Sequence, residues 1–313
     1  MAVPTNTFQT VNAVGNREDL GGIITNIAPA DTLFYSSLRS TKVTAKKHEW
    51  LTDTLPAAGS NARIEGDDAG NATAVTPRVR LYNYTQIQDK VFQISSSQEL
   101  VDKAGVDSEI DYQTTNIFMP ALAKDVEYAF TREVLAQDDG NATAGKMRGA
   151  LNWTQSNLDK AADATLNADG TVTGGSARGL TKDMVKGQMQ NAFTAGGKPE
   201  NILCGPFQAT QFNYFQQSND FSRRIVDGKM TDYVDIYQTE FGNISVKPHR
   251  NFPTDVVFGY DKRYWKKATL DAEHRVELAK SSALNRKFHI VVEHTLEANA
   301  EAANFRITNL TTS

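Results

Sequence analysis

The sequence predicts a mixed α+β fold with one long helix, one strand-rich region and two protruding arms. Three observations support this prediction. A long polar stretch from Pro56 to Pro77 separates two strand-like segments. Apolar residues recur at helical spacing over residues 108–137. Helical and strand-like segments then follow one another through the C-terminal half of the chain.

The composition excludes several classes of protein. The 313 residues carry a formal net charge of −4 with a pI near 5.8, so no global basic field attracts nucleic acid. The single cysteine, Cys204, excludes an intramolecular disulfide framework. The N-terminal residues lack a secretory signal pattern, and no run approaches the roughly 18 apolar residues of a membrane span. We therefore expect a soluble protein of intracellular origin, with one large domain or two to three smaller ones.

The first forty residues are predicted to form an arm. Within residues 20–38, Gly21-Gly22 and Pro29 exclude a single continuous helix. Asp31 is a suitable N-cap for a short helix near the end of this arm.

An extended loop is predicted over residues 41–93. Its flanking segments, 42–55 and 78–95, have the character of strands, and the tip between them has only Ile64 and Val75 as large apolar residues. Loops in compact domains have a median length of about 4–6 residues, so a tip this long without a core of its own is unusual. The simplest explanation is that the hairpin lies on another copy of the protein.

The clearest helix is predicted to begin at Ser108, the first residue of a capping-box pattern, and to continue to residue 137. Some 30 residues at 1.5 Å each give a rod of roughly 45 Å. Pro120 lies inside the helix and predicts a kink or break near Phe118. The turn residues at 138–141 end the pattern.

The next segments are predicted from turn and capping residues. Residues 153–179 are polar and glycine-rich, which is typical of a surface insertion. A helix is expected from Thr181 to Gly196-Gly197, followed by a buried strand at 201–204 and a helix that opens at Pro206.

The C-terminal part is predicted to be rich in strands. Residues 234–250 form a hairpin candidate with a two-residue Gly242-Asn243 turn. Further strands are expected at 255–260 and 287–298, and residues 305–310 are expected to pair with the latter.

Candidate active sites are weak. The segment Gly140–Met147 has the spacing of a phosphate-binding loop, but Met147 replaces the hydroxyl residue that binds Mg²⁺, and the segment follows a helix instead of a strand. A helix-ending turn is favoured over a nucleotide site. Cys204 lies in an apolar run, which favours a structural thiol over a nucleophile.

No metal or cofactor site is expected. The five histidines form no zinc pattern, and His289 and His294 are expected to face opposite sides of a strand. Asp67-Asp68 and Asp138-Asp139 lie in turns and do not complete a calcium loop. The densest basic stretch, residues 261–267, has four cations and two aromatics that could contact phosphate or lie half buried with the lysines in solvent.

Four segments together resemble the major capsid (head) proteins of tailed bacteriophages, and more narrowly a branch of phage head proteins with a domain of uncharacterised type. These segments are LGGIITNIAPADTLFYSSL, HEWLTDTL with its long Ala/Gly loop, NYTQIQDKVFQISSSQELVDKAG and GGKPENILCGPFQ. The likeness covers nearly the whole chain in the expected order.

The resemblance implies the Hong Kong 97-type capsid fold. It places an N-terminal arm at 1–40, the extended loop at 41–93, and a peripheral domain at 94–180 with spine helix 108–137 and return strands at 281–313. An axial domain would occupy 181–280. Some relatives carry a cleaved N-terminal scaffolding segment, whereas the arm here begins almost at once, so scaffolding would be a separate protein or already removed.

The resemblance also implies a structural function and no enzymatic activity. The protein would assemble into hexamers and pentamers of an icosahedral head around double-stranded DNA, without sequence-specific binding. Its partners would be itself, a portal, and scaffolding or decoration proteins; it would be made in the cytoplasm of the infected bacterium and reside in the virion. Alternatives are another assembling phage component, such as a tail or baseplate protein, or a nucleotide-binding enzyme.

The loop tip is the predicted intersubunit contact. Its candidate contact residues are Arg63, Ile64, Glu65, Asp67 and Asp68. Some capsids of this fold join subunits by an isopeptide bond from a lysine of this loop, but the tip has no lysine, and Lys42, Lys46 and Lys47 lie near its base. We therefore expect non-covalent contacts only.

Overall fold

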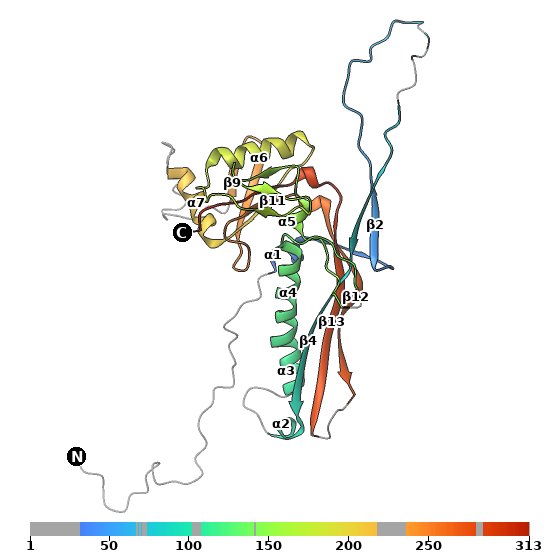
Figure 1. Ribbon diagram of the computed structural model, residues 1–313, viewed down its shortest axis with the longest axis vertical. Helices are drawn as coiled ribbons and strands as arrows, with labels where there is room; N and C mark the ends of the chain where they lie inside the picture. Colours follow the sequence, from blue (N-terminus) through green and yellow to red (C-terminus); the bar gives the residue numbers. More distant parts are fainter. Residues whose placement is uncertain are drawn as a thin grey trace, which may run out of the picture.

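Two sheets and one long helix organise the chain in the computed structural model (Figure 1). The structure describes residues 32–312 except 67, 69, 71–73, 102–107, 141, 218–235 and 280–283. An elongated part contains a four-stranded sheet with the helix along one face, and a second part contains a six-stranded sheet flanked by helices. A hairpin with a long loop projects beyond both (Figure 1).

The four-stranded sheet has the order β1-β12-β13-β4. Its two central strands are the longest in the described chain: β12, Trp265–Leu278, pairs antiparallel with β13, Asn285–Ala298. On β13, alternate residues from Phe288 to Leu296 are buried, which is the pattern of a sheet covered on one face. The outer strands are β4, Gln86–Ser95, antiparallel to β13, and β1, Arg39–Lys42, parallel to β12.

The predicted spine helix is present but shorter than expected. It consists of α3, Glu109–Tyr112, a π-helical segment, Gln113–Phe118, and α4, Met119–Thr131. The predicted cap is confirmed, because the Ser108 hydroxyl accepts the N–H of Asp111. The predicted end at 137 is wrong: Arg132 is extended, and Gln137 forms a β-bridge with Lys146. Pairing with a distant segment therefore ends the helix before its apolar periodicity does.

The helix has π-helical geometry just before Pro120. The π-helical segment ends at Phe118, and Pro120 is the second residue of α4. Phe118 and Met119 keep helical dihedral angles, so the helix is not broken there. A kink of the helix axis at Pro120 stays a prediction.

The main core lies between the spine helix and the four-stranded sheet. Buried residues on the helix pack against buried residues on β4 and β13; they are Leu122, Val126 and Phe130 from the helix, and Phe92, Ile94, Phe288, Ile290 and Val292 from the strands. Burial of each such side chain stabilises the fold by about 1.5–3 kcal/mol. On the opposite face of β13, His289, Val291 and Glu293 are only partly buried, whereas Thr295 and Glu297 near the hairpin are buried.

The six-stranded sheet has the order β5-β14-β11-β8-β10-β9. Its strands are Leu158–Asp159, Phe305–Ile307, Val257–Tyr260, Asn201–Cys204, Gly242–Pro248 and Ile236–Thr239 in that order. Helices α6, Lys182–Thr194, and α7, Pro206–Gln217, supply buried residues to its core. The predicted helix start near Thr181, the stop at Gly196 with φ +86°, the buried strand β8 and the helix opening at Pro206 are all confirmed, and the Thr181 hydroxyl caps α6 by accepting the Met184 N–H.

Three predictions in this region are wrong. The β9–β10 hairpin exists, but Thr239 pairs with Gly242, so Glu240 and Phe241 form the turn in place of Gly242-Asn243. Strand β14 pairs with β11 and β5, not with β13. The segment 153–179 is no simple surface insertion, because its strand β5 joins the six-stranded sheet and Trp153 is buried.

The remaining elements are short. They are α1, Leu33–Ser37; the hairpin strands β2, Lys47–Thr52, and β3, Val79–Tyr84; α2, Ser96–Leu100; α5, Ala150–Trp153; β6, Thr165–Leu166; β7, Val172–Thr173; and 3₁₀ turns at Lys262–Tyr264 and Glu301–Ala303. A short helix was predicted near Asp31; α1 is that helix, with Thr32 at its N-cap position, and Asp31 lies outside the described residues. Residues 1–31 of the predicted arm also lie outside them.

The sheets cut across the predicted domain limits. Strand β12 lies in the four-stranded sheet although residues 181–280 were assigned to the axial domain. Strand β14 lies in the six-stranded sheet although 281–313 were assigned to the peripheral domain. The domain limits stay a prediction, and sheet membership would place β12 with the peripheral part and β14 with the axial part.

Candidate assembly interface

The tip of the extended loop is highly exposed. Its large apolar side chains, Ile64 and Val75, are 83% and 91% exposed, and Leu55, which directly precedes it and is grouped with it below, is 95% exposed. Between β2 and β3 the described residues form no helix or strand, and Figure 1 shows the loop standing away from the rest of the chain. Single exposed apolar residues are common on protein surfaces, but here they occupy a projecting segment that has no core beneath it.

The predicted contact residues lie in this tip. Arg63, Ile64, Glu65 and Asp68 are exposed, and Arg63 Nη1 donates to the Asp68 carbonyl oxygen at 2.7 Å. Asp67 lies outside the described residues. Their contact with a neighbouring subunit stays a prediction.

The base of the same hairpin is held firmly by Asn83, which is fully buried. Its side-chain amide donates to the Leu296 carbonyl at 2.7 Å and to the Arg148 carbonyl at 3.2 Å. Its oxygen accepts the N–H groups of Arg148 at 2.7 Å and Tyr84 at 3.0 Å. One side chain therefore links β3 to β13 and to the segment before α5, with its hydrogen-bonding capacity filled.

Strand β2 is attached to the end of β13 through two side chains. Trp50 Nε1 donates to the Ala298 carbonyl at 3.0 Å, and His48 Nε2 lies 3.1 Å from Glu297 Oε2. Lys266 completes this group with a 2.7 Å ion pair to Glu297 Oε1. Burial alone would raise the pKa of Glu297, but the hydrogen bonds from Lys266 and His48 lower it below its usual value. The base is thus built around a carboxylate that is stable in its charged form.

Two of the three lysines near the base, Lys46 and Lys47, have partners within the chain. Lys46 pairs with Asp139, and Lys47 pairs with Glu49 at 2.8 Å. Asp139 also accepts the N–H of Gly145, so the segment once compared with a phosphate-binding loop supports the hairpin base instead. Met147 of that segment is buried.

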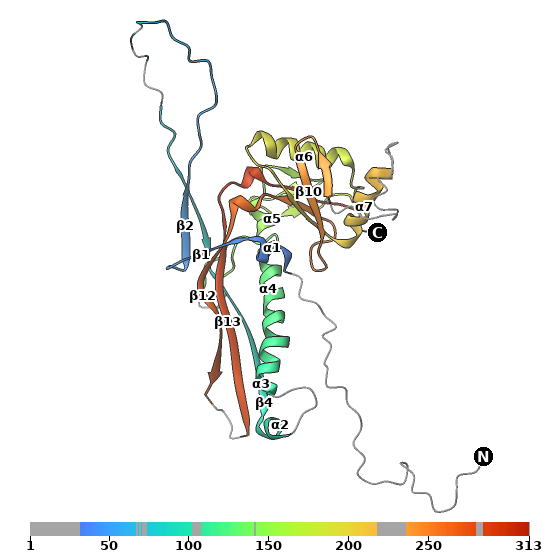
Figure 2. The same cartoon turned by 180° about the vertical axis from the view of Figure 1, so that it is seen from behind.

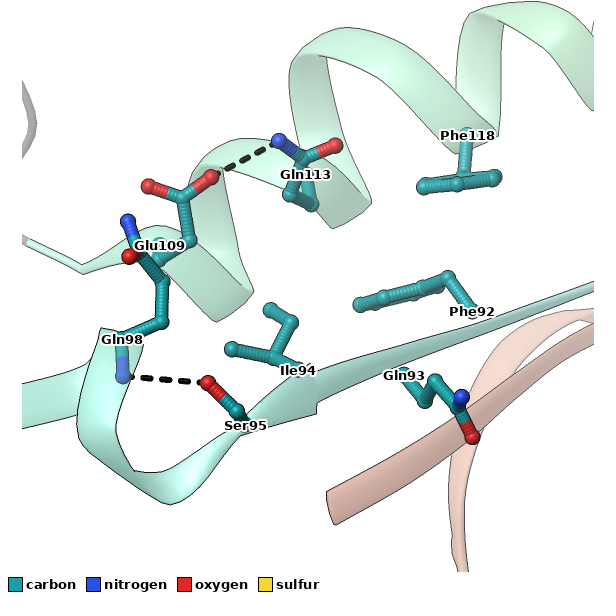
Figure 3. A pocket seen from close by; sticks show the side chains of 8 residues that line it. All are labelled: Phe92, Gln93, Ile94, Ser95, Gln98, Glu109, Gln113 and Phe118. Carbon is teal, nitrogen blue, oxygen red and sulfur yellow. Dashed lines mark hydrogen bonds between the residues drawn. The ribbon is translucent and has the colours of Figure 1, made fainter. Parts of the chain in front are cut away.

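A pocket of about 430 Å³ lies where β4 and α2 meet the start of the spine helix (Figure 3). Its apolar floor includes Phe92 stacked on Phe118, with ring centroids 4.6 Å apart. Polar groups at the rim form hydrogen bonds with one another: Gln113 donates to Glu109 at 2.7 Å, and the Ser95 hydroxyl accepts the Gln98 N–H at 3.2 Å. Among the described residues that line it, no nucleophile is hydrogen-bonded to a base.

The other candidate chemical groups are structural. Cys204 is buried, and burial raises the pKa of its thiol to about 12, which makes it a poor nucleophile. His289 pairs with Asp89 on the exposed face of the sheet, whereas His294 is buried on the other face, as expected from their spacing. Within the described ranges, no group of three or more acidic, histidine or cysteine residues could hold a metal ion.

The basic stretch at 261–267 is engaged within the chain. Arg263 forms an ion pair with Asp261, Lys266 binds Glu297, and Lys267 lies over the ring of Tyr35 at 4.0 Å from its centroid. Trp265 is fully buried. In the part of the chain that the structure describes, no helix is long and apolar enough to cross a bilayer.

Two important residues were missed from the sequence. The sequence analysis singled out neither Asn83 of a strand-like segment nor Glu127 of the predicted spine helix, although both are buried. The apolar pattern itself held a signal for Glu127, because it follows Val126 directly and precedes Phe130 by three positions on the predicted helix. Nothing in the sequence indicates which residues they bind.

Comparison with known proteins gives a consistent result. A family model described as SU10 major capsid protein matches residues 3–311. The major capsid protein of Escherichia phage Phieco32 is 25% identical over 324 residues, which cover 90% of this chain and 91% of that protein.

Solved structures show the same fold at low sequence identity. The capsid of a native GTA particle matches with a TM-score of 0.65 at 10% identity, over 96% of this chain and 98% of that one. The cyanophage A-1(L) capsid matches with a TM-score of 0.63 at 13% identity, over 97% and 99%. The Hong Kong 97-type fold predicted from the sequence is confirmed.

Proposed function

The chain belongs to the SU10 major capsid protein family, and from this premise we propose that its extended loop joins neighbouring subunits into the hexamers and pentamers of an icosahedral phage head. The observation that carries the proposal is the contrast within one hairpin. Its base is fixed by buried hydrogen bonds, whereas its tip exposes Leu55, Ile64 and Val75. A rigid base with an apolar tip is suited to reach a second subunit.

The resulting interfaces should be of the obligate kind. Such interfaces bury on the order of 2,000–5,000 Å² and combine apolar and polar contacts. The arm that precedes α1 would add further contacts between subunits. The family is one of capsid proteins, so the alternative of a tail or baseplate component has no support, and the proposal includes no enzymatic activity.

We propose that the head encloses double-stranded DNA without sequence-specific binding. The net charge of −4 and the ion pairs of Arg263 and Lys266 within the chain support weak contact with the enclosed DNA. A portal, and scaffolding or decoration proteins, are the further partners we propose. Synthesis in the cytoplasm of the infected bacterium and residence in the virion follow from the same function.

Deletion of the loop tip tests the proposal. Removal of residues 57–76 should leave a folded subunit, since the described residues of the tip contribute no side chain to either core, but should abolish shells. Electron microscopy and sedimentation would compare the deletion with the Asn61→Ser variant, which changes one exposed polar residue in the same loop. Normal closed shells from the deleted protein would refute the proposed role of the loop.

A second test concerns covalent linkage. The loop tip has no lysine, so we propose that the shell is held by non-covalent contacts alone. Boiled particles on a denaturing gel should give one band at the mass of the single chain. A ladder from dimers to hexamers would contradict this.

A further inference from the structure

Helix α1, at the root of the N-terminal arm, lacks a cap of its own. It has only five residues, and Thr32 at the N-cap position makes no side-chain hydrogen bond to the helix. An isolated helix this short is unstable in water, and its first N–H groups need acceptors. Something outside the helix must therefore hold it.

Glu127 of α4 supplies these acceptors. Its Oε1 accepts the N–H of Phe34 and its Oε2 accepts the N–H of Tyr35, both at 2.7 Å. These are the second and third residues of α1, the positions that an N-cap side chain normally serves. The helix is thus capped by a carboxylate from the spine helix, and Figure 2 shows α1 lying at the end of α4.

The carboxylate is held in place by a third element. Glu127 and His249 are both 1% exposed, and His249 Nε2 lies 3.3 Å from Glu127 Oε1. His249 Nδ1 accepts the N–H of Asn251 at 3.1 Å, so Nε2 carries a proton and faces the carboxylate. The contact lacks the geometry of a good hydrogen bond, and its attraction is therefore electrostatic.

The same group joins both sheets. His249 follows β10, and its N–H donates to the Cys204 carbonyl in the six-stranded sheet at 2.9 Å. Phe34 packs between the six-stranded and the four-stranded sheet. Its ring centroid lies 5.0 Å from that of Tyr260 in β11 and 5.8 Å from that of Trp265 in β12. After α1, the chain continues directly into β1 at the edge of the four-stranded sheet (Figure 2).

We propose that Glu127, held by His249, is a positioning residue for assembly that fixes where the N-terminal arm leaves the subunit. The inference rests on the proposed function, because the arm must leave every subunit at the same place to reach equivalent sites on its neighbours. A buried carboxylate is costly unless it is fully paired, and here its partners are the backbone of the arm root and a histidine of the second sheet. The Glu127 carboxylate thus links α1, at the root of the arm, to the spine helix and to the six-stranded sheet.

Glu127→Gln tests the proposal, because it keeps the shape and removes the charge. The matched control is Asp125→Asn, which removes a carboxylate on the same helix that forms a surface ion pair with Lys90 at 2.5 Å. We expect amide hydrogen exchange at Phe34 and Tyr35 to become at least tenfold faster in Glu127→Gln, with exchange in β13 and α6 changed less than twofold. The control should change neither.

Arm position is measured directly in unassembled subunits. Spin labels at Ala28→Cys and Gln190→Cys report the distance from the arm to the exposed face of α6, and the buried Cys204 stays unlabelled. The distance distribution should become at least twofold wider in Glu127→Gln and stay unchanged in the control. A purely structural role in the body would not change this width selectively.

Shell yield decides the role in assembly. We expect Glu127→Gln to lower it at least fivefold and the control to lower it less than twofold. Unchanged exchange at Phe34 and Tyr35, or normal shells despite a mobile arm root, would overturn the proposal. If Glu127→Gln does not fold, His249→Ala removes one partner only and should give the same pattern with smaller effects. Failure of the unmodified protein to form shells would instead refute the proposed function.

Discussion

The base and the tip of the extended hairpin differ in burial and in hydrogen bonding. At the base, Asn83 has every hydrogen-bonding position filled, and Trp50 and His48 attach β2 to the end of β13. At the tip, Ile64 and its apolar neighbours are exposed, and the Arg63 side chain makes a local hydrogen bond to the Asp68 carbonyl. We therefore expect subunit stability to depend on the base of the hairpin and assembly to depend on its tip.

The largest effect on subunit stability is expected at the base. Asn83→Ala leaves the Leu296 carbonyl and the Arg148 N–H buried without a partner, and each such group costs about 1–3 kcal/mol. We expect the free energy of unfolding to fall by roughly 3 kcal/mol, measured by urea denaturation. An Asn61→Ala variant in the tip serves as control and should change it by less than about 0.5 kcal/mol. Equal effects of the two substitutions would remove the contrast between base and tip.

Acid should destabilise the four-stranded sheet to which the base of the hairpin is attached. His294 lies on β13, two residues before Leu296, and burial together with the charge of Lys267 lowers its pKa to about 4. The unfolded chain therefore binds a proton that the folded chain does not between pH 6.5 and about 4, and stability falls as the pH drops through this window. The loss is at most about 3 kcal/mol, since one pKa unit corresponds to about 1.4 kcal/mol.

The His294→Phe variant provides the comparison for that measurement. Denaturation curves at several pH values should show a flatter dependence between pH 6.5 and 4 than in the unmodified chain. The ring contacts with Phe130, at 5.0 Å, and Tyr35, at 6.2 Å, favour an aromatic replacement. An unchanged slope would show that His294 does not carry the acid sensitivity.

The smallest effect on stability, with a marked effect on assembly, is expected at the tip. Ile64→Ser should alter the free energy of unfolding by less than about 0.5 kcal/mol, because the side chain is 83% exposed in the subunit. Shell yield should fall, because the same side chain would be buried between subunits. Leu55→Ser and Val75→Ser extend the series, with Asn61→Ser as the neutral control. If all four variants assemble equally well, the apolar tip residues do not form the contact.

Several local structures could be predicted because neighbouring residues decide them. Ser108 caps its helix, a second helix starts next to Thr181, Gly196 ends that helix at positive φ, and Pro206 opens another. The long loop was also evident, since no apolar pattern lies between Pro56 and Pro77. Cys204 was expected to be buried because of the apolar run around it, and it is.

Strand β12 shows where local patterns fail. It was read as a short basic stretch, yet it is a 14-residue strand, and its register shifts near Thr269 and Asp271 interrupt the alternation that identifies a strand. The end of the spine helix at Thr131 was missed for a related reason, because Gln137 pairs with Lys146 and competes with a helical pattern that continues past it.

The sequence by itself determined the fold class, the main helices and caps, the long exposed loop and, through resemblance to capsid proteins, the architecture. Only the tertiary structure decided how distant polar residues meet: Asn83 with Arg148 and Leu296, and Glu127 with the backbone of α1 and His249. The physical reason is that caps, turns and periodicity depend on residues within a few positions. The partner of a buried amide or carboxylate depends on which segments the packed core brings within about 3 Å. The spacing of residues along the sequence does not indicate which distant segments these are.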